Sequence, residues 1–179
     1  MEFQKVIEKR RSVRSYDPDR AVSKETITAL VEAAQLAPSW KNSQTARYHC
    51  VLDPAVLDEF RANCLPEFNA KNAENAPALV VTTFVKDKSG FLKTGEPNNE
   101  FGNGWGAYDL GLSNENFVLK ASELGLSTLI MGIRDEAKIR QLLKIDEEEI
   151  IVAVIALGYS DASPDMPKRK AADEILTFI

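Results

Sequence analysis

Two continuous apolar runs constrain the fold of this chain more than any other feature of its sequence. Residues Leu79–Val85 and Ile150–Leu157 are rich in β-branched side chains, which is typical of buried strands. Both runs are far too short to cross a bilayer. Further strands are expected at Tyr48–Leu52 and Leu126–Met131, with helices of varied length between the strands. This pattern predicts an α/β or α+β fold with a layered core.

Helix signals lie before and between these strands. The longest helix is expected over Ala107–Leu124, and Gly125 ends it because glycine readily adopts the left-handed C-cap conformation. Residues 86–106, rich in Gly, Asn, Lys and Pro, form the one long loop, and such loops are usually functional or mobile. The other expected helices are Glu2–Lys9, one capped by Ser23 that ends near Ala37, one opened by Asp53-Pro54 that runs to Cys64, a short one at Phe68–Glu74, and one capped by Asp135.

Length and charge narrow the class of protein. The chain has 179 residues, which suits a single domain over residues 1–179. It carries 22 Lys+Arg against 27 Asp+Glu, a formal net charge of −5, which argues against a general nucleic-acid partner. A local basic cluster can still hold a small anion. Because the N-terminus lacks an apolar signal core, we expect a cytoplasmic protein that has no membrane partner.

The cysteines and the single histidine do not predict a metal centre. Cys50 and Cys64 form no C-x-x-C motif, and His49 with two thiols cannot complete the usual zinc ligand sets. Under reducing conditions the two thiols are expected to be free, with a disulfide between them as the alternative. His49 is expected to be structural, since no nucleophile motif surrounds it.

Two further motifs are interpreted as ordinary structure. Gly102-x-Gly104-x-x-Ala107 imitates a dinucleotide-binding fingerprint, but it follows a polar loop where such a fingerprint requires a strand. Glu147-Glu148-Glu149 is expected to be a solvated turn.

A dense basic cluster follows the first expected helix. Arg10 and Arg14 project to the same side in a helix and in an extended segment, where Ser12 shares their face. Two guanidinium groups with a hydroxyl between them are a concentrated donor set for a phosphate or carboxylate. The alternative is a solvated helix end, where cations also favour the helix dipole. A second basic cluster, residues 167–170, is either a charged tail or another clamp on an anion.

A polar loop with one tryptophan, Pro38-Ser39-Trp40-Lys41-Asn42-Ser43-Gln44, follows the helix that proline ends. Its hydroxyls and amides can contact the edge of a planar heterocycle, and Trp40 can cover the face of an aromatic ligand. The alternative is a plain surface loop, although large aromatic side chains are seldom found on unconstrained loops.

Together these clusters resemble the FMN-dependent nitroreductase family, in order and over nearly the whole chain. The resemblance implies an α+β fold with a mixed, mainly antiparallel central sheet wrapped by helices. It also implies a homodimer with FMN at the subunit interface and reduction by NADH or NADPH. Apolar residues in Phe117–Leu124 and in the N-terminal helix independently favour a dimer. The resemblance rests on Arg10–Tyr16, Ala34–Gln44, Gly125-Leu126 with Ile130–Ile133, and Leu157-Gly158-Tyr159 with Pro167–Lys170.

The resemblance also assigns expected roles to individual residues. Arg10, Arg11 and Ser12 match the family's contacts to the FMN phosphate and ribityl chain. Arg14 matches a basic residue near the pyrimidine side of the flavin, where a cation favours the reduced form. Met131 and Gly132 match the backbone beside flavin N5, and Asn69 matches an amide near the ring. Lys168 and Arg169 match a C-terminal clamp on the phosphate. A loop that reaches the ring from the partner subunit is matched by Pro38, Ser39, Trp40, Asn42 and Gln44.

Two hypotheses of different classes follow. The first is an enzyme that transfers hydride from NAD(P)H through flavin N5 to an electron-poor small molecule such as a nitroaromatic, quinone or enone. The second is a non-catalytic flavin- or nucleotide-binding protein whose cleft is closed by Trp40, bulkier than the small residue often found there, and by the 86–106 loop. A third possibility keeps the flavin and changes the reaction, since relatives with this fold include dehalogenating and flavin-fragmenting enzymes.

Overall fold

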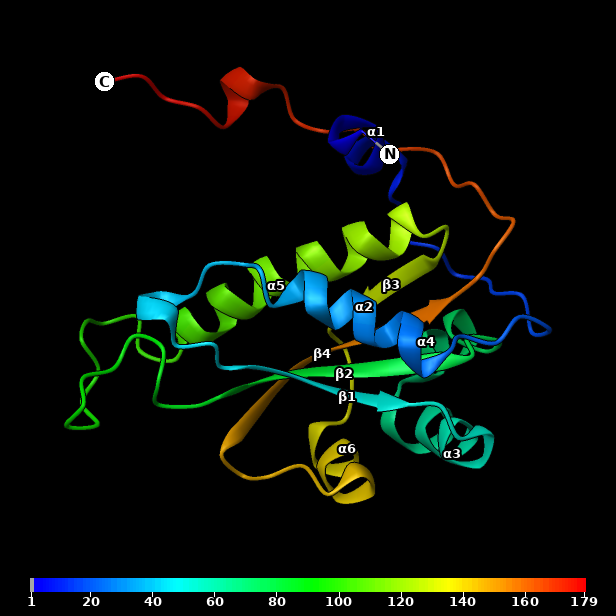
Figure 1. Cartoon of the computed structure of the whole chain (residues 1–179), viewed down its shortest axis with the longest axis horizontal. Coiled ribbons are helices and arrows are strands. Elements are labelled where there is room, and N and C mark those ends of the chain that lie inside the picture. Colours follow the sequence, from blue (N-terminus) through cyan, green and yellow to red (C-terminus); the bar gives the residue numbers. More distant parts are fainter. Residues whose placement is uncertain (1) are drawn as a thin grey trace.

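The computed structural model describes residues 2–179 (Figure 1). The order of its elements is the one expected from the sequence. The elements are α1 (Phe3–Lys9), α2 (Lys24–Ala34), the short 3-10 helix η1 (Trp40–Asn42), β1 (Ala46–Val51), α3 (Pro54–Cys64), α4 (Glu67–Asn72), β2 (Ala78–Val85), α5 (Gly104–Glu123), β3 (Ser127–Met131), α6 (Glu136–Leu143), β4 (Glu149–Gly158) and the 3-10 helix η2 (Ala172–Glu174).

The four strands form one sheet in the order β1-β2-β4-β3, and every neighbouring pair is antiparallel. In the register, Val81 of β2 lies opposite His49 of β1 and Val154 of β4. The expected mixed sheet is therefore antiparallel in all four strands. Among residues 2–179, parallel pairing occurs at a single bridge between Ser12 and Thr128.

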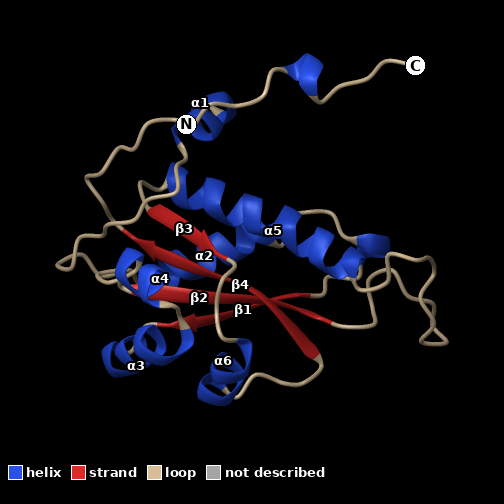
Figure 2. Cartoon of the chain, turned by 180° about the vertical axis from the view of Figure 1, so that it is seen from behind, coloured by secondary structure: helices blue, strands red, loops and turns tan. Residues whose placement is uncertain are grey.

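Helices cover both faces of the sheet (Figure 2). One core packs α3 and α6 against Val81 and its neighbours, and the other packs α2 and α5 against Val80. Because successive side chains of a strand point to opposite faces, a central strand needs apolar residues at every position. This need explains the continuous apolar runs of β2 and β4.

The longest helix, α5, begins at Gly104 rather than at the expected Ala107. Gly106 is buried in its first turns, where a Cβ atom would collide with the ring of Phe84. Glycine disfavours helices locally, but here its missing side chain lets α5 lie directly against β2. Tertiary packing therefore overrides the local signal.

The prediction of a solvated turn at residues 147–149 is wrong for Glu149. This residue begins β4, and its side chain is only 14% exposed. Its Oε2 accepts a hydrogen bond from Thr83 and lies 2.6 Å from Nε2 of His49. His49 therefore joins β1 to the start of β4 and has a structural contact.

Among residues 2–179, no helix has the length and apolar character needed to span a bilayer, and no three or more His, Cys, Asp or Glu side chains are grouped so that they could hold a metal ion. Cys50 and Cys64 are free thiols, as expected.

Candidate functional site

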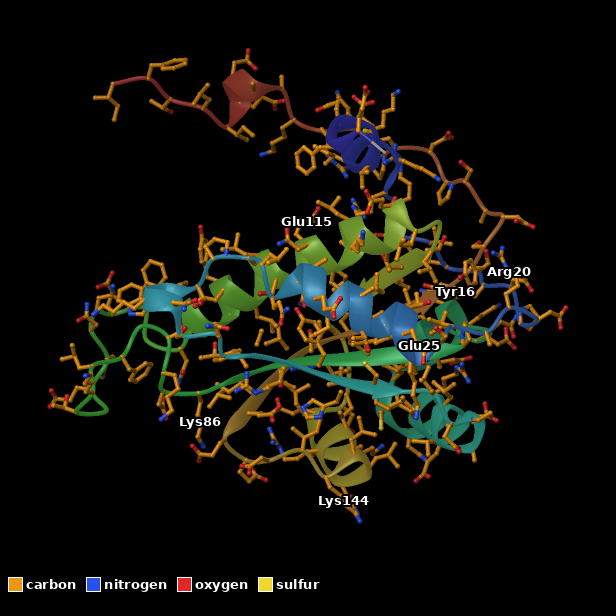
Figure 3. All side chains as sticks on the ribbon, in the orientation of Figure 1. Tyr16, Arg20, Glu25, Lys86, Glu115 and Lys144 are labelled. Carbon is orange, nitrogen blue, oxygen red and sulfur yellow. The ribbon has the colours of Figure 1, made fainter. Side chains whose placement is uncertain are left out.

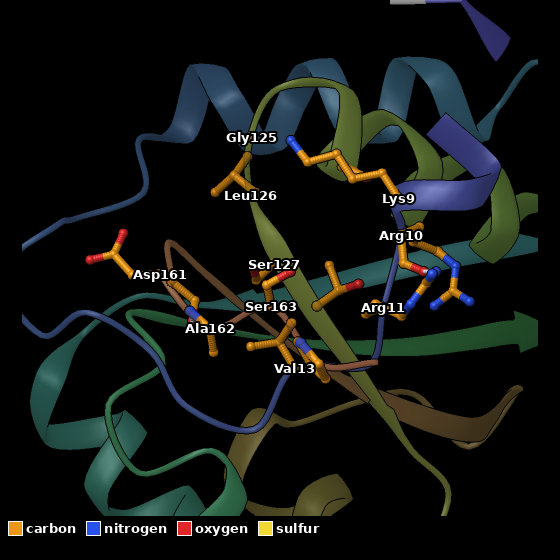
Figure 4. Close-up of a pocket in the computed structure, with 14 residues that line it drawn as sticks. Lys9, Arg10, Arg11, Val13, Gly125, Leu126, Ser127, Asp161, Ala162 and Ser163 are labelled. Atoms are coloured by element: carbon orange, nitrogen blue, oxygen red, sulfur yellow. Dashed lines mark hydrogen bonds between the residues drawn. The ribbon is translucent and has the colours of Figure 1, made fainter. Parts of the chain in front are cut away.

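A basic cavity of about 230 Å³ lies where α1 ends, beside the C-terminal end of α5. Lys9, Arg10 and Arg11 line one side, and residues 160–164 of the C-terminal tail line the other (Figure 4). Three cations thus share the cavity wall with a single carboxylate, that of Asp161. This excess of positive charge favours a bound anion.

The segment after α1 is held in place by β3. Ser12 bridges to Thr128, and the Val13 amide donates a hydrogen bond to the Thr128 carbonyl oxygen at 3.0 Å. Val13 is buried, whereas Ser12 and Arg14 are exposed, as alternation along an extended segment requires. The expectation that Arg10, Ser12 and Arg14 share one face stays a prediction, since Arg10 lines the basic cavity and neither Ser12 nor Arg14 does.

Arg11 has an unsatisfied donor at this cavity. Its Nη1 donates to the Arg10 carbonyl oxygen at 2.6 Å, but its Nε is buried without a hydrogen-bond partner. Leaving a charged donor buried and unpaired costs more than about 1–3 kcal/mol. A phosphate in the cavity offers the missing acceptor, since guanidinium groups bind phosphate oxygens strongly. The donor set therefore fits a phosphate-bearing cofactor.

Lys168 and Arg169 do not line the basic cavity. The tail leaves the cavity after Pro164 and extends away from the sheet (Figure 1). Both tail cations are exposed, and Nη1 of Arg169 donates to the Pro167 carbonyl oxygen at 3.1 Å. The structure brings the first basic cluster together with the start of the tail, but leaves the second basic cluster outside.

The far end of β3 carries the residues expected near a flavin ring. Met131 is buried at the end of the strand, and Gly132 is exposed. Asn69 of α4 is also buried, and its Nδ2 donates to the Ile133 carbonyl oxygen at 2.9 Å. The structure thus brings Asn69 to this segment. Ser127, which lines the basic cavity, lies four residues before Met131, or roughly 13 Å along an extended strand.

The Ser39–Gln44 loop has a strained backbone. Lys41, Asn42 and Gln44 have φ values of 47°, 56° and 50°. This left-handed conformation costs a non-glycine residue about 1–2 kcal/mol. The Gln44 amide donates to Ser39 Oγ at 3.1 Å, which closes the loop. Strain that neighbouring contacts hold in place is typical of functional sites.

Asp109 of α5 connects this loop to a second one. Its Oδ2 accepts hydrogen bonds from the Trp40 amide at 2.9 Å, from Ser89 Oγ at 2.5 Å and from Ser43 Oγ at 3.5 Å. Ser89 belongs to the long loop of residues 86–103. One buried carboxylate oxygen therefore joins two loops to α5.

Aromatic side chains surround Trp40. The ring centres of Trp40 and Trp105 are 4.7 Å apart. Trp105 also packs edge-on against Phe101 at 5.5 Å and Tyr108 at 5.8 Å, and its Nε1 donates to Asn99 Oδ1. These contacts join the rings of Trp40, Phe101, Trp105 and Tyr108 into one cluster.

The expected site residues form two groups at opposite ends of α5. The Ser39–Gln44 loop contacts Asp109 near the start of the helix, whereas the basic cavity includes Ser122 near its end. Ser122 lies thirteen residues after Asp109, or roughly 20 Å along the helix axis. A single copy of the chain does not bring the loop to the basic cavity. That the loop acts from a partner subunit stays a prediction.

The fold and the order of these residues agree with known proteins. A sequence model described as the nitroreductase family matches residues 7–159, so this chain belongs to that family. A protein of Archaeoglobus fulgidus, named "Putative NADH dehydrogenase/NAD(P)H nitroreductase", is 30% identical over 170 residues, covering 90% of this chain and 87% of its own length.

Solved structures share the whole fold. A nitroreductase family protein from Streptococcus pneumoniae TIGR4 superimposes with a TM-score of 0.85 at 21% identity, covering 99% of this chain and 100% of its own. A protein from Exiguobacterium sibiricum 255-15, solved in complex with FMN, also gives a TM-score of 0.85 at 20% identity, covering 100% and 98% of the two chains. At these identities the likeness establishes the fold alone.

Sequence reasoning missed three residues of the site: Lys9, Trp105 and Asp109. Lys9 precedes the arginines, but a lysine in the last turn of a helix is ordinary. Asp109 had a usable signal, because it lies four and eight residues before Ser113 and Phe117, on the buried side of the helix. An acidic residue on a buried helix face needs partners.

Proposed function

We propose that this protein is an FMN-dependent oxidoreductase that transfers hydride from NADH or NADPH through flavin N5 to an electron-poor small molecule such as a nitroaromatic, quinone or enone. The observation that carries the proposal is the basic cavity, with the buried and unpaired Nε of Arg11, in a chain of the nitroreductase family. FMN supplies the redox chemistry when bound. The residues of the chain bind it, orient it and adjust its potential.

The first basic cluster holds the phosphate in this proposal. Arg10 and Arg11 donate charge-assisted hydrogen bonds to it, and Lys9 adds a third cation. Ser12 and Arg14 follow along the edge of β3, toward the end of the strand where the ring lies. The cation at Arg14 stabilises negative charge on the pyrimidine side of the ring.

The end of β3 forms the other boundary of the ring site. The backbone of Met131 and Gly132 lies beside the ring. Asn69 positions this backbone through its hydrogen bond to Ile133, in place of the direct ring contact that the resemblance implied.

The second group of residues reaches the ring from another copy of the chain. In the homodimer that we propose, the site is completed by the loop residues Pro38, Ser39, Trp40, Asn42 and Gln44. An apolar groove of about 310 Å³ between α1, α2 and α5 supports pairing. Phe3 and Leu36 line it and are 70% and 80% exposed, so a second copy would cover surface that water disfavours.

The two surfaces expected to favour a dimer differ in exposure. On α1, Phe3 is exposed, as expected. On α5, by contrast, Phe117 is fully buried, and its ring stacks on Tyr48 within the same chain at 5.6 Å. Val118 and Ala121 are buried as well, whereas Leu124 at the end of the expected segment is 44% exposed.

The second basic cluster can join the phosphate site by movement of the tail. Lys168 is four residues beyond Pro164, which lines the basic cavity. A fully extended chain of four residues spans at most about 14 Å. We propose that bound phosphate draws Lys168 and Arg169 toward the cavity.

A closed, non-catalytic flavin-binding protein is the alternative. The packing of Trp40 against Trp105 supports this alternative, because this contact, with the long loop tied to Asp109, would close the cleft.

We place the protein in the cytoplasm, where reducing conditions suit its two free thiols.

The absorption spectrum of the purified protein, before and after reconstitution with FMN, tests the proposal first. We expect the two visible bands of oxidised flavin, and bleaching by NADH or NADPH without air, followed by recovery when a quinone is added. Bound flavin that is not reduced by either nucleotide would support the closed binding protein. Failure to bind FMN at all would contradict both.

A further inference from the structure

The buried carboxylate of Asp109 has a role that goes beyond filling space in the core. It is 4% exposed, and three hydrogen bonds converge on one of its two oxygens. No salt bridge to Asp109 occurs among residues 2–179. Its negative charge is therefore balanced by N–H and O–H donors, all of which come from two loops.

The loop that Asp109 holds has a strained backbone. Three of its backbone conformations are left-handed at non-glycine positions. Hydrogen bonds within the loop, from the Asn42 and Gln44 amides to Ser39 and from the Ser43 amide to Trp40, close it on itself, and Asp109 ties it to α5. The Trp40 amide lies at the turn into this strained stretch and donates to Asp109. The carboxylate therefore fixes where the indole of Trp40 lies.

The same oxygen of Asp109 also helps to fix the position of Trp105, against which Trp40 packs. Ser89 ties the long loop to Asp109, and Gly90 next to it lies so close to Trp105 that a Cβ atom would come within 2.5 Å of that ring. Asp109 is itself one helical turn from Trp105 on α5. The contact between the two indoles is therefore built from groups that Asp109 connects.

We propose that Asp109 is a positioning residue that holds Trp40 against Trp105, and that this pair sets how tightly planar aromatic acceptors bind in the cleft. The inference rests on the proposed function, in which the Trp40 loop lies over the flavin of the second subunit. A wall of fixed aromatic rings favours flat aromatic molecules, because stacking depends on ring geometry. Small aliphatic acceptors gain little from it.

The test compares Asp109→Asn with Glu115→Gln, which removes an exposed carboxylate from the outer face of the same helix (Figure 3). Two indoles in contact give an exciton couplet in far-ultraviolet circular dichroism, and Trp105→Phe identifies it. We expect Asp109→Asn to lose most of this couplet. We also expect it to raise KM for an aromatic quinone by about ten- to a hundred-fold, and to raise KM for a small aliphatic enone by much less. Glu115→Gln should change neither.

Ser89→Ala provides a second variant if Asp109→Asn does not fold, and it should weaken the couplet and raise the quinone KM in the same direction. An unchanged couplet and unchanged KM in a folded Asp109 variant would overturn the proposal. So would an equal rise of KM for both acceptors, which indicates a general loss of structure. If the wild-type protein shows no turnover, the proposed function fails. The couplet still tests the positioning by Asp109 in that case.

Discussion

Ser12 pairs with Thr128 in a parallel bridge that fixes the arginine segment along the edge of β3. This contact orders a segment that would otherwise be a solvated connection between α1 and α2. It places the side chains before it at the basic cavity and Arg14 further along the strand. The division of roles that we propose for the arginines rests on this register.

Replacing Arg10 or Arg11 by alanine should weaken FMN binding. Each loses charge-assisted hydrogen bonds worth about 1.5–3 kcal/mol, or roughly ten- to a hundred-fold in affinity. Fluorescence titration with FMN measures the change. Lys24→Ala, at an exposed position that begins α2, is the matched control and should bind as the wild type does. Unchanged affinity in both arginine variants would mean that the cluster is a solvated helix end.

Arg169→Ala tests the movement of the tail. We expect FMN affinity to fall about ten-fold, in the same direction as in the Arg10 and Arg11 variants. The cation of Arg169 approaches the phosphate only when the cofactor binds. Protease digestion with and without FMN should show protection of the tail in the bound state. If affinity and digestion do not change, the tail stays outside the site.

Arg14→Gln should make the bound flavin harder to reduce and should affect FMN affinity less than Arg10→Ala does. Removing the cation destabilises negative charge on the reduced ring, and a loss of about 1.4 kcal/mol lowers a two-electron potential by about 30 mV. Redox titration measures this shift. Arg20→Gln is the control, since that guanidinium lies over the Tyr159 ring at 3.7 Å. A constant potential with collapsed affinity would make Arg14 a phosphate ligand.

Two glycines of α5 should respond oppositely to alanine. Gly106→Ala places a Cβ against the Phe84 ring and should lower the free energy of unfolding by about 1–3 kcal/mol. Gly111→Ala meets no atom within 4 Å, and should raise the free energy by up to about 1 kcal/mol because alanine favours helix. Denaturant unfolding of both variants checks the pair. Equal effects would contradict the close packing of α5 on β2.

Cys64 should react slowly with alkylating reagents. Burial, with a smaller effect from the charge of Asp135, raises the pKa of its thiol to about 11, and only the thiolate reacts. Labelling of a Cys50→Ser variant should therefore be slow near neutral pH and should speed up as the pH rises toward 11. Denatured protein provides the fully reactive reference. Labelling of the native protein at the denatured rate would contradict the buried site.

The helices and strands were predictable because their signals are local. The aspartate of Asp53-Pro54 caps α3, with its Oδ1 accepting from the Ala55 and Val56 amides, and the apolar runs became the two central strands. The start of α5 was not predictable, because the reason for Gly106 is the Phe84 ring, which is distant in sequence. Likewise, Glu149 takes its role from His49 and Thr83 on other strands.

The candidate site was predictable by residue type but not by placement. Basic and amide-bearing clusters are typical of a site for a phosphate and a planar ring. Their separation by the length of α5 depends on the fold. The burial of Asp109 had a signal in the sequence, but the partners of Asp109 and Trp105 could not be assigned, because their contacts to the Trp40 loop cross 65 or more residues of sequence.

The central claim, one FMN site built from two copies of the chain, is tested most directly by complementation. One variant carries Arg10→Ala with Arg11→Ala, and the other carries Asn42→Ala with Gln44→Ala. Each should lose FMN-dependent reduction when expressed alone. Co-expressed with different tags and purified as a mixed dimer, the two chains should regain one intact site, with about half the wild-type flavin content and activity. Mixed dimers that stay inactive, each chain having one defect in its own site, would contradict a shared site.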